Sequence, residues 1–158
     1  MEQQKEKSER AVVLAVDGSE QSKKAFNWYM ENIQRDGDHV FVLTVGDFSQ
    51  KINFGILPGN YSEERLKEII EQVQAESNKV EVMLADFVEQ LRAKRIHGEA
   101  AHIPEKNVGA GICEFAEKHN ASMICMGTRG LGTMRRTVLG SVSDFVVHHS
   151  RCPCIIVH

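Results

Sequence analysis

Short apolar runs that alternate with amphipathic helical segments constrain this chain more than any other feature. Residues 11–16 are all apolar, and the run stops at Asp17-Gly18-Ser19. A continuous apolar run of this length is typical of a strand buried on both faces of a parallel sheet. We therefore predict a strand at 10–17 and, by similar patterns, strands at 39–45, 121–126 and 153–157, with a weaker strand-like segment at 97–103.

Helical periodicity fills the intervals between these runs. Apolar residues recur at helical spacing over 25–33, 66–91 and 108–116, and a last stripe runs from Val142 to His149. The first helix would be capped by Asp17 or Ser19. The second is predicted as a single long helix from 62 to about 95, bent near Ser77. The stretch 46–60, punctuated by Gly, Asn and Pro, is typical of a long loop.

The order of elements is therefore βαβαβαβαβ, without a convincing hairpin turn. Such alternation predicts a parallel sheet covered by helices on both faces, because each strand-to-strand connection must cross over. We predict one doubly wound α/β domain over 10–158, with strand order 3-2-1-4-5, behind a disordered tail at 1–9. In this order the chain reverses between strands one and four, and small ligands bind beyond the carboxyl ends that flank that crevice.

Composition argues against several classes of function. The 158 residues carry 19 basic and 22 acidic side chains, a net charge of -3, so no overall positive field attracts nucleic acid or an anionic membrane. The apolar runs are far too short to span a bilayer, and residues 1–10 do not resemble a secretory signal. Four cysteines without a Cys-x-x-Cys pair favour reduced, buried thiols. We therefore expect a cytoplasmic protein that binds neither nucleic acid nor membrane.

The motif that carries most chemistry follows the fourth strand. Gly127 and Gly130 allow positive φ and a close approach of the backbone. Gly140-Ser141 opens the last helix, whose free amides at 141–143 attract phosphate oxygens. The hydroxyls of Ser141 and Ser143 add donors at the same place. The connecting loop supplies cations for charge-assisted contacts, namely Arg129, Arg135 and Arg136.

Simpler structural explanations exist for parts of this pattern. Ser141-x-x-Asp144 resembles an N-terminal capping box, and paired arginines in loops are commonly only solvated. Asp17, at the carboxyl end of the first strand, could bond ribose hydroxyls as an acidic residue does in dinucleotide-binding folds, or it could cap the first helix. The residues alone leave these alternatives open.

The spacing Gly127-x2-Gly130-x9-Gly140-Ser141 resembles the nucleotide-binding motif of the universal stress protein family. Further segments are similar to the family's first strand with its terminal aspartate, its glycine motif and its closing strand: 12–17, 126–130, 139–143 and 152–157. The resemblance covers residues 10–158. Two departures are Ala15, where a proline is often found, and 102–108, which lacks the usual Gly-Asp-Pro-like turn.

In nucleotide-binding members of that family, the resemblance implies ATP, or AMP or ADP, at the crevice, together with Mg²⁺ or Mn²⁺. Adenine would lie near Ala15 and Val45, and Asp17 would hold the ribose. The rest of the implied site would line the sugar and phosphates: Met126, Gly127, Arg129, Gly130, Gly140, Ser141, Val142 and Ser143. We assign no catalytic residue and no metal-ligating side chain.

Motifs of fast catalysis are missing from the sequence. No glycine is followed by lysine, which removes the Gly-Lys-Ser/Thr phosphate loop, and neither Gly-x-Gly-x-x-Gly nor Gly-x-Ser-x-Gly occurs. We therefore expect an ATP-binding stress protein that acts as a nucleotide-dependent sensor or adaptor, with at most slow hydrolysis. Two alternatives stay open: a dimeric stress-response adaptor of the same fold that binds no nucleotide, and a slow ATPase or nucleotidyl-transfer enzyme that uses Arg129 or Arg136.

The last strand also predicts self-association. Residues 154–157 are apolar, form a sheet edge in the predicted order, and have only His158 after them to cover that edge. Members of the family commonly dimerise there, so the resemblance also implies a homodimer. The expected partners are thus an adenine nucleotide, a second copy of the chain and unidentified proteins.

Overall fold

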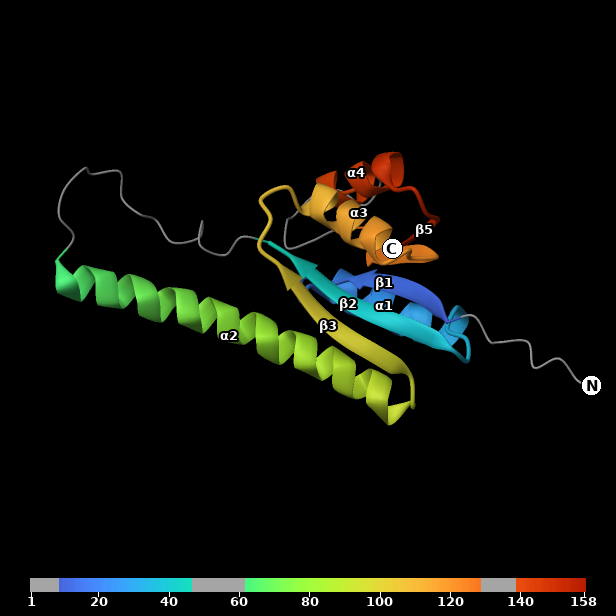
Figure 1. Cartoon of the computed structure of the whole chain (residues 1–158), viewed down its shortest axis with the longest axis horizontal. Coiled ribbons are helices and arrows are strands. Elements are labelled where there is room, and N and C mark those ends of the chain that lie inside the picture. Colours follow the sequence, from blue (N-terminus) through green and yellow to red (C-terminus); the bar gives the residue numbers. More distant parts are fainter. Residues whose placement is uncertain (1–8, 47–61, 129–138) are drawn as a thin grey trace, which may run out of the picture.

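The computed structural model describes residues 9–46, 62–128 and 139–158, which form a parallel sheet with helices on both faces (Figure 1). The predicted alternation of strands and helices is confirmed. In chain order the elements are β1 (Arg10–Ala15), α1 (Glu20–Asn32), β2 (Asp38–Val45), α2 (Glu63–Ala93), β3 (His97–Ile103), α3 (Val108–Lys118), β4 (Met123–Gly127), α4 (Ser141–His149) and β5 (Cys154–Val157).

The sheet has the order β3-β2-β1-β4-β5, and each pair of neighbouring strands is parallel. This result confirms the doubly wound α/β fold with strand order 3-2-1-4-5. The chain moves outward from β1 through β2 to β3, then returns to the other side of β1 for β4 and β5. The crevice of such a fold lies above the carboxyl ends of β1 and β4.

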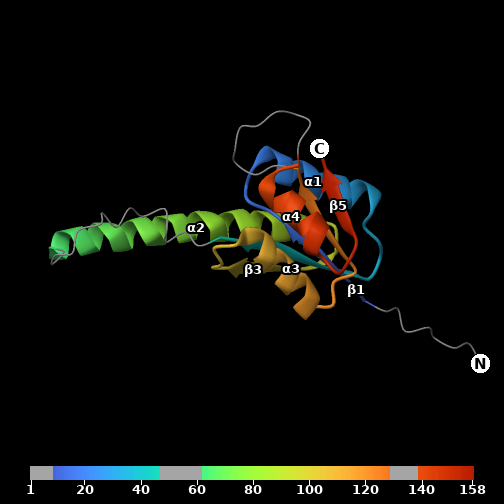
Figure 2. The ribbon, with the colours of Figure 1, turned by 90° about the horizontal axis from the view of Figure 1, so that it is seen from above.

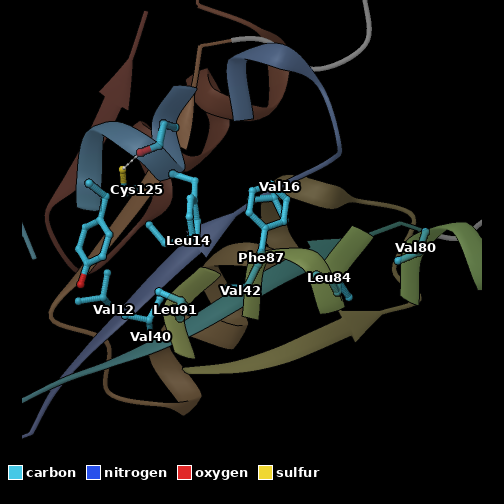
Figure 3. Close-up of a cluster of buried hydrophobic side chains, with 13 residues drawn as sticks. Val12, Leu14, Val16, Val40, Val42, Val80, Leu84, Phe87, Leu91 and Cys125 are labelled. Carbon is cyan, nitrogen blue, oxygen red and sulfur yellow. Dashed lines mark hydrogen bonds between the residues drawn. The ribbon is translucent and has the colours of Figure 1, made fainter. Parts of the chain in front are cut away.

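Two hydrophobic cores lie on opposite faces of the sheet. Val12 and Leu14 of β1, together with Val16 just after it, pack against α1 and the C-terminal part of α2 (Figure 3). The alternate residues Val13 and Ala15 pack against α3 and α4. Strand β1 is therefore buried on both faces, as its continuous apolar run predicts.

The two edge strands, β3 and β5, differ from β1 in their burial. Strand β3 is partly or fully exposed along its whole length, so its mixed composition belongs to a sheet edge. Strand β5 forms the opposite edge, and all four of its residues are partly buried. The predicted edge position of β5 is therefore confirmed.

Helix α2 runs for 31 residues and passes Ser77 without interruption. Its C-terminal part packs on the sheet, whereas its N-terminal part extends beyond the sheet (Figure 2). Leu66 and Ile70, which belong to the apolar stripe in the sequence, are 44% and 55% exposed. The stripe thus predicts the helix but not the point at which its burial ends. None of the described helices, α2 included, combines the length and the hydropathy that crossing a bilayer requires.

Arg10, Tyr29 and Asp38 form a polar cluster at the amino ends of β1 and β2. Arg10 donates through Nε and Nη2 to both carboxylate oxygens of Asp38, at 2.7 and 2.6 Å, and Tyr29 donates its hydroxyl proton to Oδ2. Burial by itself would raise the pKa of Asp38, but hydrogen bonds from Arg10, Tyr29 and the amide of Arg35 outweigh burial and hold that pKa below its usual value. The carboxylate is therefore charged and fully paired.

We predict that Asp38→Asn lowers the free energy of unfolding at pH 7 by about 3 kcal/mol, because Arg10 loses a counter-charge that is only 1% exposed. The folded pKa of Asp38 lies below the unfolded value of about 3.9. The stabilisation that the ionised Asp38 gives to the folded state is therefore complete above the unfolded pKa. It is lost as the pH falls through the folded pKa. Urea unfolding followed by circular dichroism should show that wild type and variant converge in acid.

Lys23→Ala is the matched control, because it removes an exposed ion pair in which Lys23 Nζ lies 3.0 Å from Glu20. We expect it to change the free energy of unfolding by less than about 0.5 kcal/mol at either pH. A difference between wild type and Asp38→Asn that stays constant or widens in acid would contradict the role given to the carboxylate.

Candidate functional site

A cavity of about 370 Å³ opens at the carboxyl edge of the sheet, where β1 and β4 end. This is the crevice that the strand order predicts. Each predicted site residue that the structure describes lines this cavity: Ala15, Asp17, Val45, Met126, Gly127, Gly140, Ser141, Val142 and Ser143. The fold therefore brings together residues that lie more than a hundred positions apart in the sequence.

One side of the cavity is an apolar wall that the sequence analysis missed. Leu43 reaches it from β2, and Val108 and Ile112 reach it from the first turns of α3. Gly111 permits this approach, because a Cβ there would lie 2.7 Å from Cγ1 of Val45. The helical stripe of α3 indicates that Val108 and Ile112 face inward, but not that they reach a cavity. Such a wall suits the ring of a heterocyclic ligand.

Asp17 lies exposed at the end of β1 and lines the cavity. Its Oδ1 accepts a hydrogen bond from the amide of Ser19 at 2.9 Å, which orients the carboxylate. The N-cap of α1 is Ser19, whose hydroxyl oxygen accepts from the amide of Ser22 at 3.2 Å. Of the two predicted caps, Asp17 is therefore the wrong one. Its Oδ2 makes no hydrogen bond to another described residue, and Asp17 borders the cavity.

Gly127 ends β4 at the point where α1 passes closest. A Cβ on Gly127 would lie 2.8 Å from the backbone carbon and oxygen of Gln21. The missing Cβ thus allows a close approach of the backbone, and the partner is α1. Gly127 does not use the positive φ that a glycine also allows, since only Gly18 and Gly37 have positive φ among the described glycines. The missing Cβ, and not a left-handed backbone, is what this position requires.

Helix α4 begins at the cavity without a side-chain cap. Its N-cap is Gly140, whose own amide donates to the carbonyl of Thr128 at 2.8 Å. Ser141 is the first residue of the helix, so the predicted capping box of Ser141 with Asp144 is wrong. The amides of 141–143 belong to the first turn, where a helix has no internal acceptors for them. No hydrogen bond from these amides occurs within the part of the chain that the structure describes.

The two serines of α4 have different roles. The Ser143 side chain is buried, and its hydroxyl lies 3.0 Å from the carbonyl oxygens of both Thr128 and Gly140. Its single proton is therefore used to hold the start of α4 against the end of β4, and the prediction that it serves as a free donor to a ligand is wrong. The Ser141 residue is exposed and lines the cavity.

The described lining carries charges of both signs, at two different places. The first turn of α4 carries a partial positive charge of about half an electron. Asp17 is the only charged side chain among the described residues that line the cavity. Arg129, Gly130, Arg135 and Arg136 lie outside the described residues. The described lining can therefore bind an anion through amides and a hydroxyl through Asp17, but it contains no pair of groups suited to acid–base catalysis.

Fold and site together define an α/β domain with a cavity at its topological switch point. The sequence model of the universal stress protein family matches residues 9–158, and the chain belongs to that family. A universal stress protein of Methanocaldococcus jannaschii is 31% identical over 150 residues, which cover 94% of this chain and 81% of that protein. A relative from Arabidopsis thaliana is 29% identical over 162 residues, which cover 94% of this chain but only 64% of the relative's length.

Solved structures of other universal stress proteins share the fold. The protein from Lactobacillus plantarum aligns with a TM-score of 0.67 at 20% identity, covering 95% of this chain and 98% of that chain. A family protein from Arabidopsis thaliana with AMP bound gives 0.62 at 20% identity, covering 94% and 90%. The protein from Archaeoglobus fulgidus in complex with dAMP gives 0.57 at 23% identity, covering 94% and 97%.

We predict that Gly127→Ala lowers the free energy of unfolding by about 1–3 kcal/mol, because the new methyl group meets the backbone of Gln21, which moves only with α1. Gly98→Ala in β3 is the comparison variant, since its Cβ meets Cδ1 of Leu91, the end of a side chain that is buried but can change rotamer. Chemical denaturation of both variants should show the smaller loss in Gly98→Ala. An equal or larger loss there would refute the argument from backbone contact.

Proposed function

We propose that this protein binds an adenine nucleotide, ATP in particular, in the cavity at the ends of β1 and β4. The observation that carries the proposal is the uncapped start of α4, which lines the same cavity as Asp17 and an apolar wall. A helix N-terminus with free amides binds phosphate oxygens, and the wall offers a place for a base. The volume of about 370 Å³ falls within the usual range for small-molecule pockets, about 300–1,000 Å³.

The proposed placement follows the chemistry of the lining. The base lies against Ala15, Val45 and the apolar wall, and the ribose hydroxyls donate to Asp17. The phosphates accept from the amides of 141–143, with the Ser141 hydroxyl beside them. Arg129 and Gly130, which the family resemblance assigns to the same phosphates, complete the proposed site. Relatives with AMP and dAMP bound support an adenine nucleotide as the ligand class.

A divalent cation, Mg²⁺ or Mn²⁺, would accompany the nucleotide. Mg²⁺ in such sites keeps several waters and binds mainly through substrate phosphates, with one or two protein carboxylates. Asp17 is the only carboxylate among the described lining residues. The lining therefore fits a cation that enters with the phosphates and is held mainly by them. Such a cation would neutralise part of the phosphate charge.

We further propose that the functional event is binding, with hydrolysis slow at most, and that the protein acts as a nucleotide-dependent sensor or adaptor in the cytoplasm. The described lining offers no base to activate water. The sequence also has no lysine of the phosphate-loop type. All four cysteines are free thiols, and burial raises the pKa of Cys125 to about 12, which suits a reducing compartment.

We predict that Gly140→Val weakens ATP binding at least tenfold without unfolding the protein. Gly140 has φ -67 and ψ 156, a conformation that valine adopts freely, so the new side chain adds no backbone strain. It projects from the N-cap of α4, beside the amides that are proposed to hold phosphate. Calorimetry with MgATP should show binding to the wild type and at least a tenfold weaker affinity, about 1.4 kcal/mol, in the variant.

Two controls accompany this experiment. Ala100→Val adds methyl groups on the exposed edge strand β3 and should bind ATP like the wild type. Ser141→Ala removes a hydroxyl but keeps the amide, so its loss should be smaller than that of Gly140→Val. A wild type that binds no ATP at millimolar concentration would overturn the proposal. The better hypothesis would then be a dimeric stress-response adaptor that binds no nucleotide.

We also propose a homodimer through β5. The strand lies at the sheet edge, and Cys154–Val157 stay only partly buried within one chain. An unpaired apolar edge of this kind pairs readily with a second copy. Sedimentation equilibrium at micromolar concentration should give twice the monomer mass, and a monomer at that concentration would refute this assembly.

A further inference from the structure

Two histidines and a glutamate converge at the amino ends of β2 and β3, far from the cavity. His39 and His97 are directly paired across the two strands, and Glu99 lies two residues further along β3. One ligand atom from each side chain can be chosen so that all three lie within 4.8 Å of one another. Nothing in the sequence brings these residues together, because 58 positions separate His39 from His97.

His39 is the fixed member of this cluster. Its ring stacks with those of Phe41 and His97, with centroid distances of 4.4 and 4.2 Å. Its Nε2 is shielded from water and lies 2.7 Å from Oε1 of Glu99. The contact does not meet hydrogen-bond geometry, however, and Nε2 has no other hydrogen-bond partner among the described residues. A buried ring nitrogen therefore points at a carboxylate without a bond that satisfies it.

We propose that His39, His97 and Glu99 bind one divalent transition-metal cation of the Zn²⁺ type. Imidazole nitrogens together with a carboxylate are ligands that Zn²⁺ accepts in open sites, whereas Mg²⁺ and Ca²⁺ prefer oxygen ligands alone. A cation at this point supplies the buried Nε2 with the partner that Glu99 by itself does not provide. It also neutralises the Glu99 carboxylate.

Closure around a cation requires a shift of the ligand atoms and a rotation of the His97 ring. Zn²⁺ bonds of about 2.0–2.1 Å in a tetrahedron place neighbouring ligand atoms about 3.3 Å apart. The atoms of the cluster lie within 4.8 Å, so closure needs shifts of the order of 1 Å. His97 and Glu99 are exposed and can supply these shifts, with the His97 ring turning out of its stack until its lone pair converges with that of His39. Packing holds His39 in place.

This metal site is separate from both proposed interaction regions. At a rise of about 3.3 Å per residue, the length of β2 from His39 to Val45 places the site about 20 Å from the nucleotide cavity. It lies at the β3 edge of the sheet, opposite the β5 edge through which dimerisation is proposed. Three protein ligands leave at least one coordination position to water, because His97 and Glu99 face solvent.

The test is titration of the full chain, without tag and without nucleotide, with Zn²⁺ alone by calorimetry. We expect one Zn²⁺ per chain, loss of that binding in His97→Ala, and a weakening of about tenfold or more in Glu99→Gln. Both substitutions fall on exposed side chains of an edge strand, so the variants should remain folded, which circular dichroism checks. His148→Ala is the matched control, because His148 is another exposed histidine beside a carboxylate, 3.7 Å from Asp144, and should leave Zn²⁺ binding unchanged.

Titration with Co²⁺ separates this site from the cysteines. Nitrogen and oxygen ligands give only weak visible bands, whereas thiolate ligands add an intense near-ultraviolet band. The expected spectrum lacks that band and disappears in His97→Ala. A wild type that binds no Zn²⁺ at micromolar concentration, a Co²⁺ complex with the thiolate band, or binding that persists in His97→Ala would each overturn the proposal.

Discussion

The ion pair between Arg10 and Asp38 is the interaction that aligns the sheet. Strand β1 is apolar on both faces, so a slip by one residue against β2 would exchange one apolar face for another at little cost in burial. The ion pair removes this ambiguity, because the two residues are Cα partners and bond bidentately only in the observed register. Tyr29 donates to the same carboxylate, so one buried group positions β1, β2 and α1 together.

That register decides where the cavity forms. Ala15 lies beside Leu43 on one side and Met126 on the other, so the three strands reach the cavity at the same level. Thr128 then joins the next elements to this edge. Its amide donates to the carbonyl of Val157, and its carbonyl accepts from the Gly140 amide and the Ser143 hydroxyl. Helix α4 therefore starts at the cavity because one residue after β4 bonds both β5 and α4.

How much could be predicted from the sequence depended on whether the signal was local. Strand β1 and helix α3 carry continuous or periodic apolar patterns, and the alternation of such elements predicts the strand order. The Ser143 hydroxyl was wrongly expected to be a free donor, and the contact of Gly127 with α1 was not foreseen, because the Thr128 carbonyl and the Gln21 backbone that they meet lie in other parts of the chain. Val108 and Leu43 were missed for the same reason. Their patterns indicate burial, and only the packing of α3 over β2 turns burial into a cavity wall.

In the proposed site an anion is recognised by the backbone, which would explain why the signature of the site in the sequence is a spacing of glycines. Asp17 is itself an anion, and the Ser143 hydroxyl is engaged within the protein, so the main donors are the amides of 141–143. Any residue except proline carries such an amide. Phosphate binding through these amides therefore places little constraint on which residues occupy positions 141–143. Position 140 is different, because a side chain on the N-cap would stand before those amides. A preformed backbone of this kind can hold a phosphate, but it has no proton to give or take, which favours binding over cleavage.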